Sequence, residues 1–285
     1  MPFVPEAVAT TPVPEPGRAP WAPRLIGLLD GLRLLAGGRL RTPGAIVLAY
    51  HDVGNDPDNA TDYYVSPSRL RQQLGRAVGW GVRFVDLAEL TSAVISGDDT
   101  DRLGAIVFDD SLVGVHHHAL PILVEAGLPA TIFAVSDALG SVPPWWQGAA
   151  RVMTRSEIEE AASAGLRIAS HTCTHPSLPS LGANGIHDEL SDSKSRLEDI
   201  VGSEIDLLAY PYGHHDQRVR DEAARAGYRA GFSFLNGRIT AGLDPLRLPR
   251  LGMWQGQAPL RLAYHLARPP DSWPDTQLGT VVGSS

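Results

Sequence analysis

Two adjacent carboxylates, Asp109 and Asp110, directly follow the apolar run at 105–108. Like charges repel at close range, so two ionised carboxylates at the end of a buried strand are unfavourable. A divalent cation removes this repulsion by binding one of them, and the other can then act as a base in the field of the cation. The alternative is a solvated turn, because aspartate is common in turns.

His171 and His175 lie four residues apart, directly after a second apolar run at 166–170. Imidazoles at this spacing can converge on one ion across a helical turn or a tight loop, although the same spacing also arises by accident. With one carboxylate they would form a metal site that keeps open positions. Zinc is the expected ion for a hydrolase, and such mixed ligands also accept cobalt, nickel or iron. We expect Cys173, between them, to be a small buried thiol.

Two further segments follow apolar runs. Residues 210–213 (Tyr-Pro-Tyr-Gly) form either a simple turn or a loop whose backbone N–H groups stabilise an oxyanion. His51 follows the run at 45–50 and has a reference pKa near ~6.5, which suits proton transfer. The alternative for His51 is a buried histidine whose polar atoms are satisfied by Asp52 or by a backbone carbonyl.

The elements that must position these residues alternate along the chain. We expect strands at 45–50, 82–85, 104–108, 129–135, 166–170, 206–210, 229–234 and 246–251. We expect helices at 24–36, 67–78, 115–126, 155–164, 183–201, 215–226 and 258–267. Seven or eight strands alternating with helices predict an α/β protein with a parallel sheet, and a closed or nearly closed barrel fits one domain of ~230 residues. In such barrels the chemistry lies where the strands end, which is where all four segments fall.

We divide the chain into three parts. Residues 1–42 are predicted to be a Pro-rich arm and an amphipathic helix, residues 43–268 the catalytic domain, and residues 269–285 a flexible tail. The helix at 24–36 carries leucines at 25, 28, 29, 32 and 35 on one side. We expect this helix to pack on the domain, with a membrane-surface helix as the alternative.

Composition excludes several classes. The net charge of −8, from 24 basic and 32 acidic residues, argues against nucleic acid as a partner. The single cysteine excludes a scaffold built on disulfides. The first residues do not resemble a secretory signal, and the most apolar segment nearby is too short and too charged to span a bilayer. We therefore expect a cytoplasmic protein with no integral membrane segment, with peripheral membrane association as the alternative; the sequence leaves the oligomeric state open.

The four segments, in this order, resemble the polysaccharide deacetylase (NodB-homology) family. Residues 108–133 resemble its first motif, in which an aspartate pair precedes a helix and a Gly-Leu-Pro-Ala-Thr strand. Residues 171–178 resemble its histidine-x-x-x-histidine motif and residues 210–213 its third motif. Residues 48–53 resemble the subgroup whose catalytic histidine lies early in the chain, which includes the poly-N-acetylglucosamine deacetylases. The resemblance covers about residues 43–255 and implies an irregular (β/α)7-type barrel, a NodB-like deformed TIM barrel.

The resemblance also implies an activity: a metal-dependent hydrolase that removes N-acetyl groups from an amino sugar or glycan and releases acetate. The implied metal ligands are Asp110, His171 and His175. Asp109 would be the general base, and the backbone N–H of Tyr212 would stabilise the oxyanion. His51 would be the general acid that protonates the leaving amine.

Two positions depart from the family pattern. Members usually have glycine where this chain has Ser111, and many have an arginine that orients the base where this chain has Ala209. Arg250 or Arg247, near the end of a later strand, are the candidates to replace that arginine, and we assign this catalytic role to Arg250.

We further expect substrate contacts from Pro211, Gly213 and Trp146, with Trp145 as the alternative to Trp146, because aromatic faces stack on sugar rings. The triplet at 116–118 is expected to be an exposed helical face whose three imidazoles fan around the axis, with an adventitious metal site as the alternative.

Three other functions remain as alternatives. An O-deacetylase or an amidase on a non-glycan would use the same residues. A catalytically silent carbohydrate-binding protein on the same fold is motivated by Ser111 and by the missing arginine. An iron oxygenase with two histidines and one carboxylate ranks below these, because such sites usually place histidine and carboxylate two residues apart on one strand.

Overall fold

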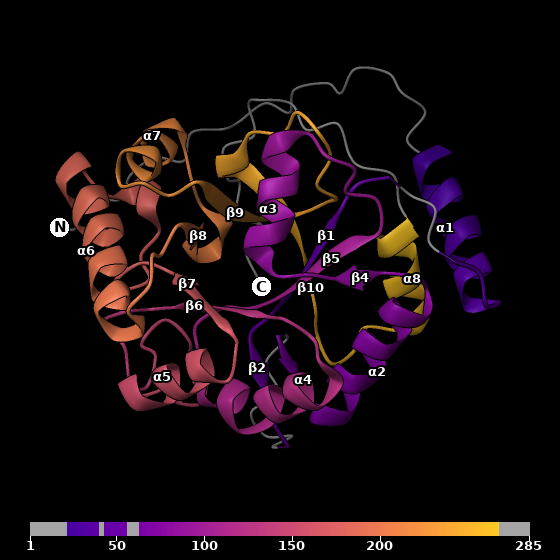
Figure 1. Cartoon of the computed structure of the whole chain (residues 1–285), viewed down its shortest axis with the longest axis horizontal. Helices are drawn as coiled ribbons and strands as arrows, with labels where there is room; N and C mark the ends of the chain where they lie inside the picture. The colour runs from indigo at the N-terminus through magenta and orange to yellow at the C-terminus, as the bar shows by residue number, and fades with distance from the viewer. Residues whose placement is uncertain (1–21, 40–42, 56–62, 268–285) are drawn as a thin grey trace, which may run out of the picture.

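Seven parallel strands close into a barrel in the computed structural model, which describes residues 22–39, 43–55 and 63–267 (Figure 1). The barrel strands are β1 (Ile46–Tyr50), β5 (Leu103–Phe108), β6 (Thr131–Ala134), β7 (Arg167–Ser170), β8 (Leu207–Ala209), β9 (Ala230–Asn236) and β10 (Leu248–Gly252). The ring closes because β1 pairs with both β5 and β10. This arrangement confirms the predicted irregular (β/α)7-type barrel. The predicted arm up to residue 21 and the predicted tail 269–285 lie outside the described residues.

Three short strands lie outside the ring. Strand β4 (Arg83–Phe84) adds to the sheet beside β5, and β2 (Asp52–Val53) pairs with β3 (Tyr64–Val65) in a small parallel ribbon. The sequence patterns predicted β4 but not the ribbon, because two-residue strands are too short to show an alternation of apolar and polar residues.

Helices surround the ring in Figure 1. They are α2 (Pro67–Gly79), α4 (Leu120–Ala126), α5 (Arg155–Ser163), α6 (Ala183–Val201), α7 (Gln217–Arg225) and α8 (Pro259–Ala267). Local signals fix their ends: the Ser66 side chain accepts a hydrogen bond from the backbone N–H of Arg69 at the start of α2. Gly202 adopts a left-handed conformation at the end of α6. These helices confirm the predicted alternation.

Both faces of the barrel strands are buried, which explains their continuous apolar runs. Alternate side chains point into the ring, where Val47, Val107, Phe133 and Phe232 belong to one buried cluster. The intervening side chains, among them Leu48 and Ile106, pack with the surrounding helices in a second cluster.

The helix α3 (Leu87–Ser96) was not predicted. Its Leu87, Leu90 and Val94 belong to the same cluster as the inward-facing strand residues, so the helix closes one end of the barrel. Its buried residues Leu87, Leu90 and Val94 recur at helical spacing, and Glu89, Ser92 and Ser96 are exposed on the other side. Its end signals were also readable, since Asp86 caps its start and Gly97 ends it in a left-handed conformation.

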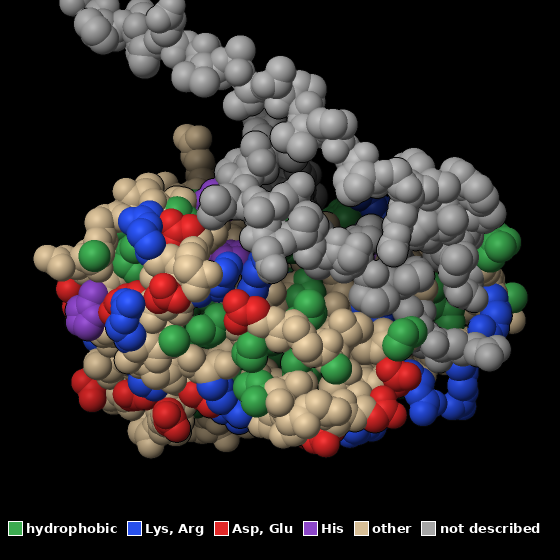
Figure 2. All heavy atoms as spheres, turned by 90° about the horizontal axis from the view of Figure 1, so that it is seen from above, with side chains coloured by type: hydrophobic (Ala, Val, Ile, Leu, Met, Phe, Trp, Pro, Cys, Tyr) green, Lys and Arg blue, Asp and Glu red, His purple; other side chains and the backbone are tan. Residues whose placement is uncertain are grey.

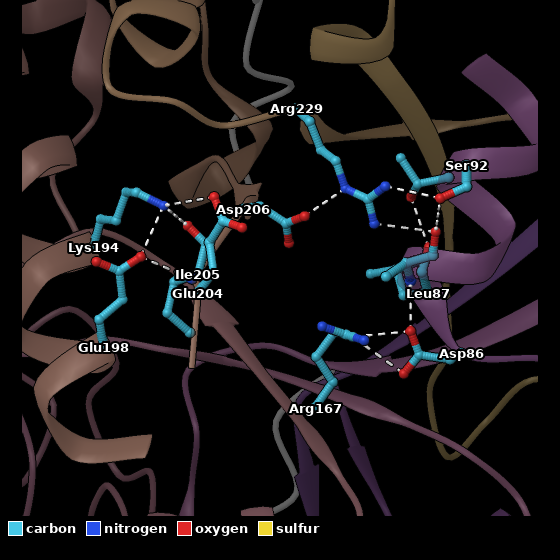
Figure 3. Close-up of polar contacts among 12 residues, drawn as sticks. Asp86, Leu87, Ser92, Arg167, Lys194, Glu198, Glu204, Ile205, Asp206 and Arg229 are labelled. Atoms are coloured by element: carbon cyan, nitrogen blue, oxygen red, sulfur yellow. Dashed lines mark hydrogen bonds and ion pairs between the residues drawn. The ribbon is translucent and has the colours of Figure 1, made fainter. Parts of the chain in front are cut away.

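Charged contacts fasten α3 at the end where the strands begin (Figure 3). Asp86 forms an ion pair with Arg167, the first residue of β7, at 2.9 Å. Arg229, just before β9, pairs with Asp206 at 2.5 Å and donates a hydrogen bond to the hydroxyl of Ser92 on α3 at 2.8 Å. This end of the barrel is therefore a structural closure, and the opposite end remains for chemistry.

The helix predicted at 115–126, in which Pro121 is a candidate for a kink, is two elements. Residues Val115–Ala119 form a π-helical turn (η2), and α4 begins at Leu120. Pro121 lacks an N–H and cannot continue the hydrogen-bond pattern of an α-helix, which accounts for a change of geometry at this point.

The helix α1 (Ala22–Leu35) packs against α8 with the side opposite to the one expected. Leu34 is buried, and a Cβ atom at Gly31 would lie 3.1 Å from the backbone nitrogen of Tyr264, which is tighter than an ordinary contact. Four of the predicted packing leucines are instead exposed, namely Leu28, Leu29, Leu32 and Leu35. The helix α1 thus presents to α8 the side with Gly31, where the absence of a side chain lets the two helix backbones approach closely, and not the side with the leucines.

The distribution of surface charge and the length of the helices are two further features of the structure. Acidic and basic side chains are interspersed over the described part of the face shown in Figure 2. Within the described ranges, no helix combines the length and the apolar character that crossing a membrane requires.

Candidate metal and catalytic site

The predicted site residues converge where the barrel strands end. Asp109 and Asp110 follow β5, His171 follows β7, and His51 follows β1. Parallel strands bring their carboxyl ends to the same rim of a barrel, so residues far apart in the sequence meet there. The closure by α3 lies at the other end of the same strands.

Asp110, His171 and His175 bring their ligand atoms within 4.8 Å of one another. The Nε2 atoms of His171 and His175 lie 3.7 and 3.2 Å from the same carboxylate oxygen of Asp110. All three residues are buried. Two imidazole nitrogens and one carboxylate oxygen suit zinc and neighbouring divalent transition metals, and three protein ligands leave positions open for water and substrate.

Hydrogen bonds orient the ligands toward a common point. His171 Nδ1 lies 2.7 Å from the backbone oxygen of Ala209, so the ring donates there and keeps Nε2 as the free acceptor. Trp145 Nε1 donates to Asp110 Oδ1 at 3.1 Å. The Trp145 ring also stacks on His175, with ring centroids 4.5 Å apart. One indole therefore contacts two of the three candidate ligands.

The ionisation of the three side chains fits a cation. Burial raises the pKa of Asp110 to about 8, and the charge of Asp109 adds to this rise. Burial lowers the pKa of His171 and lowers that of His175 to about 2. Both imidazoles are therefore neutral, which is the form that binds a metal, and the Asp110 carboxylate is poorly stabilised by the protein alone.

Asp109 is stabilised as a carboxylate by a different partner. Arg250 Nη1 donates to Asp109 Oδ1 at 2.6 Å, and Arg250 Nε donates to the backbone oxygen of Ser233 at 2.9 Å. Burial alone would raise the pKa of Asp109, but the Arg250 guanidinium holds that pKa well below its usual range. Of the two candidate arginines, the structure brings Arg250 to Asp109. Two neighbouring aspartates thus have opposite pKa shifts.

His51 lies on the other side of Asp109, with Nε2 3.8 Å from Asp109 Oδ2. Burial lowers the pKa of His51 to about 4, against the opposing effect of the Asp109 charge. Three aromatic rings surround the imidazole with centroids 4.7 to 5.7 Å away, those of Tyr63, Phe234 and Trp146. Asp52 hydrogen-bonds to the backbone N–H of Val53 at 2.8 Å and is not the partner of the His51 ring.

The loops that carry the site have unusual backbone geometry. Six non-glycine residues among those described have φ in the left-handed region, and five of them lie in the site loops: Asp110, Ser111, Thr172, His175 and Tyr212. L-residues avoid this region because the side chain crowds the backbone, and such strain often accompanies functional sites. The side-chain directions at this rim therefore depend on a backbone that the surrounding packing must hold.

Glu189 of α6 holds the histidine loop and was not predicted. Its carboxylate accepts hydrogen bonds from the backbone N–H groups of Cys173 and Thr174 at 2.8 and 2.9 Å. The backbone N–H of His175 in turn donates to the Thr172 hydroxyl at 3.1 Å. Sequence alone gave no signal for Glu189, because it lies on the polar side of a long amphipathic helix. Cys173 is buried.

The residues of the loop at 210–213 differ in how close they lie to the candidate metal ligands. The Tyr212 ring is half-exposed and meets the His175 ring edge-on at 4.7 Å, so this residue lies beside the ligands. The side chain of Pro211 is buried. A side chain at Gly213 would collide with the backbone nitrogen of Phe234, so glycine is needed there for packing. Both positions shape the loop.

The aromatic residues take different places. Trp146 lies near His51, as its predicted substrate contact requires, whereas Trp145 supports the candidate metal ligands. Tyr63 and Phe234 were missed. The position of Phe234 in β9, on the rim that carries the other site residues, was the signal that pointed to it.

The barrel and the rim of metal-ligating and acid–base residues together define the class of protein. Residues 96–231 match the family described as polysaccharide deacetylase. This region is therefore a polysaccharide deacetylase domain, the family that the four motifs predicted.

Relatives extend the similarity beyond that region. The poly-beta-1,6-N-acetyl-D-glucosamine N-deacetylase of Staphylococcus epidermidis is 25% identical over 231 residues, which cover 73% of this chain and 78% of the relative. The Bacillus subtilis protein YxkH is 28% identical over 132 residues, 46% of this chain, and that match spans only 44% of YxkH. The deacetylase PplD of Streptococcus pyogenes shares the fold, with a TM-score of 0.69 at 24% identity over 80% of this chain and 100% of PplD.

Proposed function

We propose that the protein is a metal-dependent hydrolase that removes the acetyl group from an N-acetylated amino sugar within a glycan. The observation that carries this proposal is the contrast between the two adjacent aspartates. Asp109 is held ionised by Arg250, and Asp110 faces two neutral histidines. One carboxylate is thus available for proton transfer and the other for a cation, which amide hydrolysis requires.

Asp110, His171 and His175 would hold the ion, with zinc the first choice. When bound, the ion would supply Lewis-acid polarisation of the acetyl carbonyl and favour deprotonation of water near neutral pH. The buried ligand set and its neutral imidazoles fit this ion, and the ion would stabilise the ionised form of Asp110, which burial disfavours.

The other site residues would have distinct roles in the reaction. Asp109 is ionised and is not one of the three proposed metal ligands, so it would accept the proton of the attacking water. The backbone N–H of Tyr212, beside His175, would donate to the oxyanion that develops on the acetyl oxygen. His51, 3.8 Å from Asp109, would deliver a proton to the departing amine. Because burial favours the neutral form of His51, that proton must arrive during the reaction, and Asp109 would be its nearest donor once it has accepted the proton of the attacking water.

A sugar ring fits the aromatic rim around His51. Tyr63, Trp146 and Phe234 meet the imidazole from several sides, and aromatic faces of this kind stack on the apolar faces of sugars. The Staphylococcus epidermidis relative is by name a deacetylase of a poly-N-acetylglucosamine. The structure of PplD is described as a complex with acetate, which is the product that this reaction releases.

The test is release of acetate and of free amine from N-acetylglucosamine oligomers, with and without added zinc. We expect zinc-dependent release by the natural protein and a loss of at least ~10²-fold in Asp109→Asn, because a general base typically contributes 10²–10⁴-fold. Asp110→Asn should lose the zinc ion held by His171 and His175 as well as activity, whereas Asp109→Asn should keep that ion. This difference separates the base from the ligand.

The same assay on O-acetylated sugars distinguishes the two deacetylase chemistries. Release from O-acetyl substrates alone would replace the N-deacetylase with an O-deacetylase. Zinc binding together with glycan binding but no acetate release on either substrate would indicate a silent carbohydrate-binding protein on this fold.

A further inference from the structure

A second cluster of metal-binding side chains lies on the outside of the barrel. His116 and His117 of the π-helical turn Val115–Ala119 face the helix α5, and their ring nitrogens lie within 4.8 Å of a carboxylate oxygen of Glu157. The prediction for this stretch was an exposed face with three diverging imidazoles. Instead His116 is only 18% exposed, and its ring lies 5.5 Å from that of His117.

The π-helical turn explains why neighbouring histidines converge. Consecutive side chains of a regular α-helix diverge by about 100° around its axis. The wider turn changes this angle, and turns of this kind are found frequently at functional sites. Across from it, Glu157 and Glu160 lie three residues apart on α5 and therefore on one face of that helix. Two imidazoles thus meet two carboxylates.

The separations fit a small cation. His116 Nε2 lies 3.0 Å from Glu160 Oε2, and His117 Nε2 lies 3.7 Å from Glu157 Oε1. Ligand atoms bound tetrahedrally to zinc at about 2.0–2.1 Å are themselves about 3.3 Å apart. Glu157 Oε1 accepts one hydrogen bond, from Arg151 Nη2 at 2.7 Å, and so retains a lone pair. His116 Nδ1 is buried without a hydrogen-bond partner.

We propose that His116, His117, Glu157 and Glu160 form a second site for a divalent transition cation such as zinc. It is separate from the cluster at the barrel rim and does not depend on the proposed hydrolase activity. A cation there would join the turn that follows the Asp110 segment to α5. It would therefore brace the loop that carries Asp110 from outside the barrel.

The chain offers a matched control. His118 belongs to the same histidine triplet but not to the cluster. The side chains of His117 and Glu160 are 53% and 64% exposed, so their replacement leaves the core intact. Loss of a histidine can thus be compared at two neighbouring positions.

Equilibrium dialysis of the full chain against micromolar zinc, followed by elemental analysis, tests the proposal. We expect two equivalents of zinc for the natural protein and for His118→Gln, and one for His117→Gln and for Glu160→Gln. In an Asp110→Asn background, zinc should still raise the melting temperature, and adding His117→Gln should abolish that rise. If His117→Gln and His118→Gln bind the same amount of zinc, the site does not exist.

Discussion

Arg250 Nη1 lies 2.6 Å from Asp109 Oδ1 in the closed interior of the barrel, although 141 residues separate the two in the sequence. The guanidinium also lies over the rings of Phe133 and Phe234, at 5.6 and 5.4 Å from their centroids. Arg250 of β10 therefore lies where the sequence analysis expected an arginine from a later strand to contact Asp109. This contact sets the charge of the proposed base.

Replacing Arg250 with glutamine should raise the pKa of Asp109, because the cation that opposes its burial is removed. The acidic limb of the pH dependence of kcat/KM should then move to higher pH, and activity at pH 7 should fall by roughly 10²-fold or more. Stability should also fall, by about 3–5 kcal/mol, because a buried carboxylate loses its partner. Arg250→Lys should restore part of both effects.

The control for this change is Arg167→Gln at the other end of the barrel. It breaks the ion pair with Asp86 and can lower stability, but it should leave the pH profile unchanged. An unaltered acidic limb in Arg250→Gln would contradict the assigned role of Arg250.

Trp145→Phe should weaken zinc binding about 10- to 100-fold. Phenylalanine keeps a ring beside His175 but cannot donate the hydrogen bond that the indole makes to Asp110. Losses of this size are typical when a group that orients a metal ligand is removed. Competition with a chelator of known affinity measures the effect. Trp146→Phe, which alters the ring near His51, should leave zinc affinity unchanged and raise KM instead.

Ser111→Gly should stabilise the protein by about 1 kcal/mol. Ser111 has φ of 49°, and its hydroxyl is buried without a hydrogen-bond partner. Glycine removes both costs, although it gains more freedom in the unfolded chain. Thermal unfolding measures the change, and Ser203→Gly in an exposed turn should give no gain. A fall in melting temperature for Ser111→Gly would show that the left-handed backbone is not strained.

Acid should destabilise the start of α5 through Glu157. Its pKa is lowered from 4.5 to about 2, first by the hydrogen bonds from Arg151 and then by those from Thr154. A depressed carboxyl pKa stabilises the fold above pH 4.5, and this contribution disappears as the pH falls toward 2. We expect it to be about 2 kcal/mol after allowance for solvent screening.

Chemical unfolding in the presence of a chelator between pH 5 and 2 measures this contribution. Glu157→Gln should flatten the pH dependence in that window. Glu159→Gln, which removes an exposed ion pair with Arg155, should not. Equal slopes for the two variants would exclude Glu157 as the cause.

Sequence patterns predicted the barrel because its strands are buried on both faces and therefore appear as continuous apolar runs. The helix α3 was missed although its buried residues Leu87, Leu90 and Val94 recur at helical spacing; what the sequence does not show is that the helix packs against the inward-facing strand residues. The patterns also assigned the wrong packing side to α1, where the contact of Gly31 with α8 decides the orientation. The side of a helix that becomes buried depends on the neighbouring element, and the sequence of the helix alone does not show which element that is.

The candidate metal ligands could be proposed from spacing, because each follows the end of a predicted strand. The supporting residues could not. Glu189 and Trp145 act through contacts formed only after distant loops fold together, and neither lies at a position that spacing singles out. The left-handed conformation of Asp110 and His175 was equally invisible, since both residue types are compatible with ordinary turns.

The five left-handed residues at the rim have a practical meaning for anyone who wishes to move this chemistry to another scaffold. Copying the aspartates and histidines onto regular strand ends would reproduce their identities but aim their side chains elsewhere. A successful transplant must carry over whole loops together with the residues that pack against them. Libraries that vary only the metal-ligand positions would leave the backbone conformation of these loops unchanged.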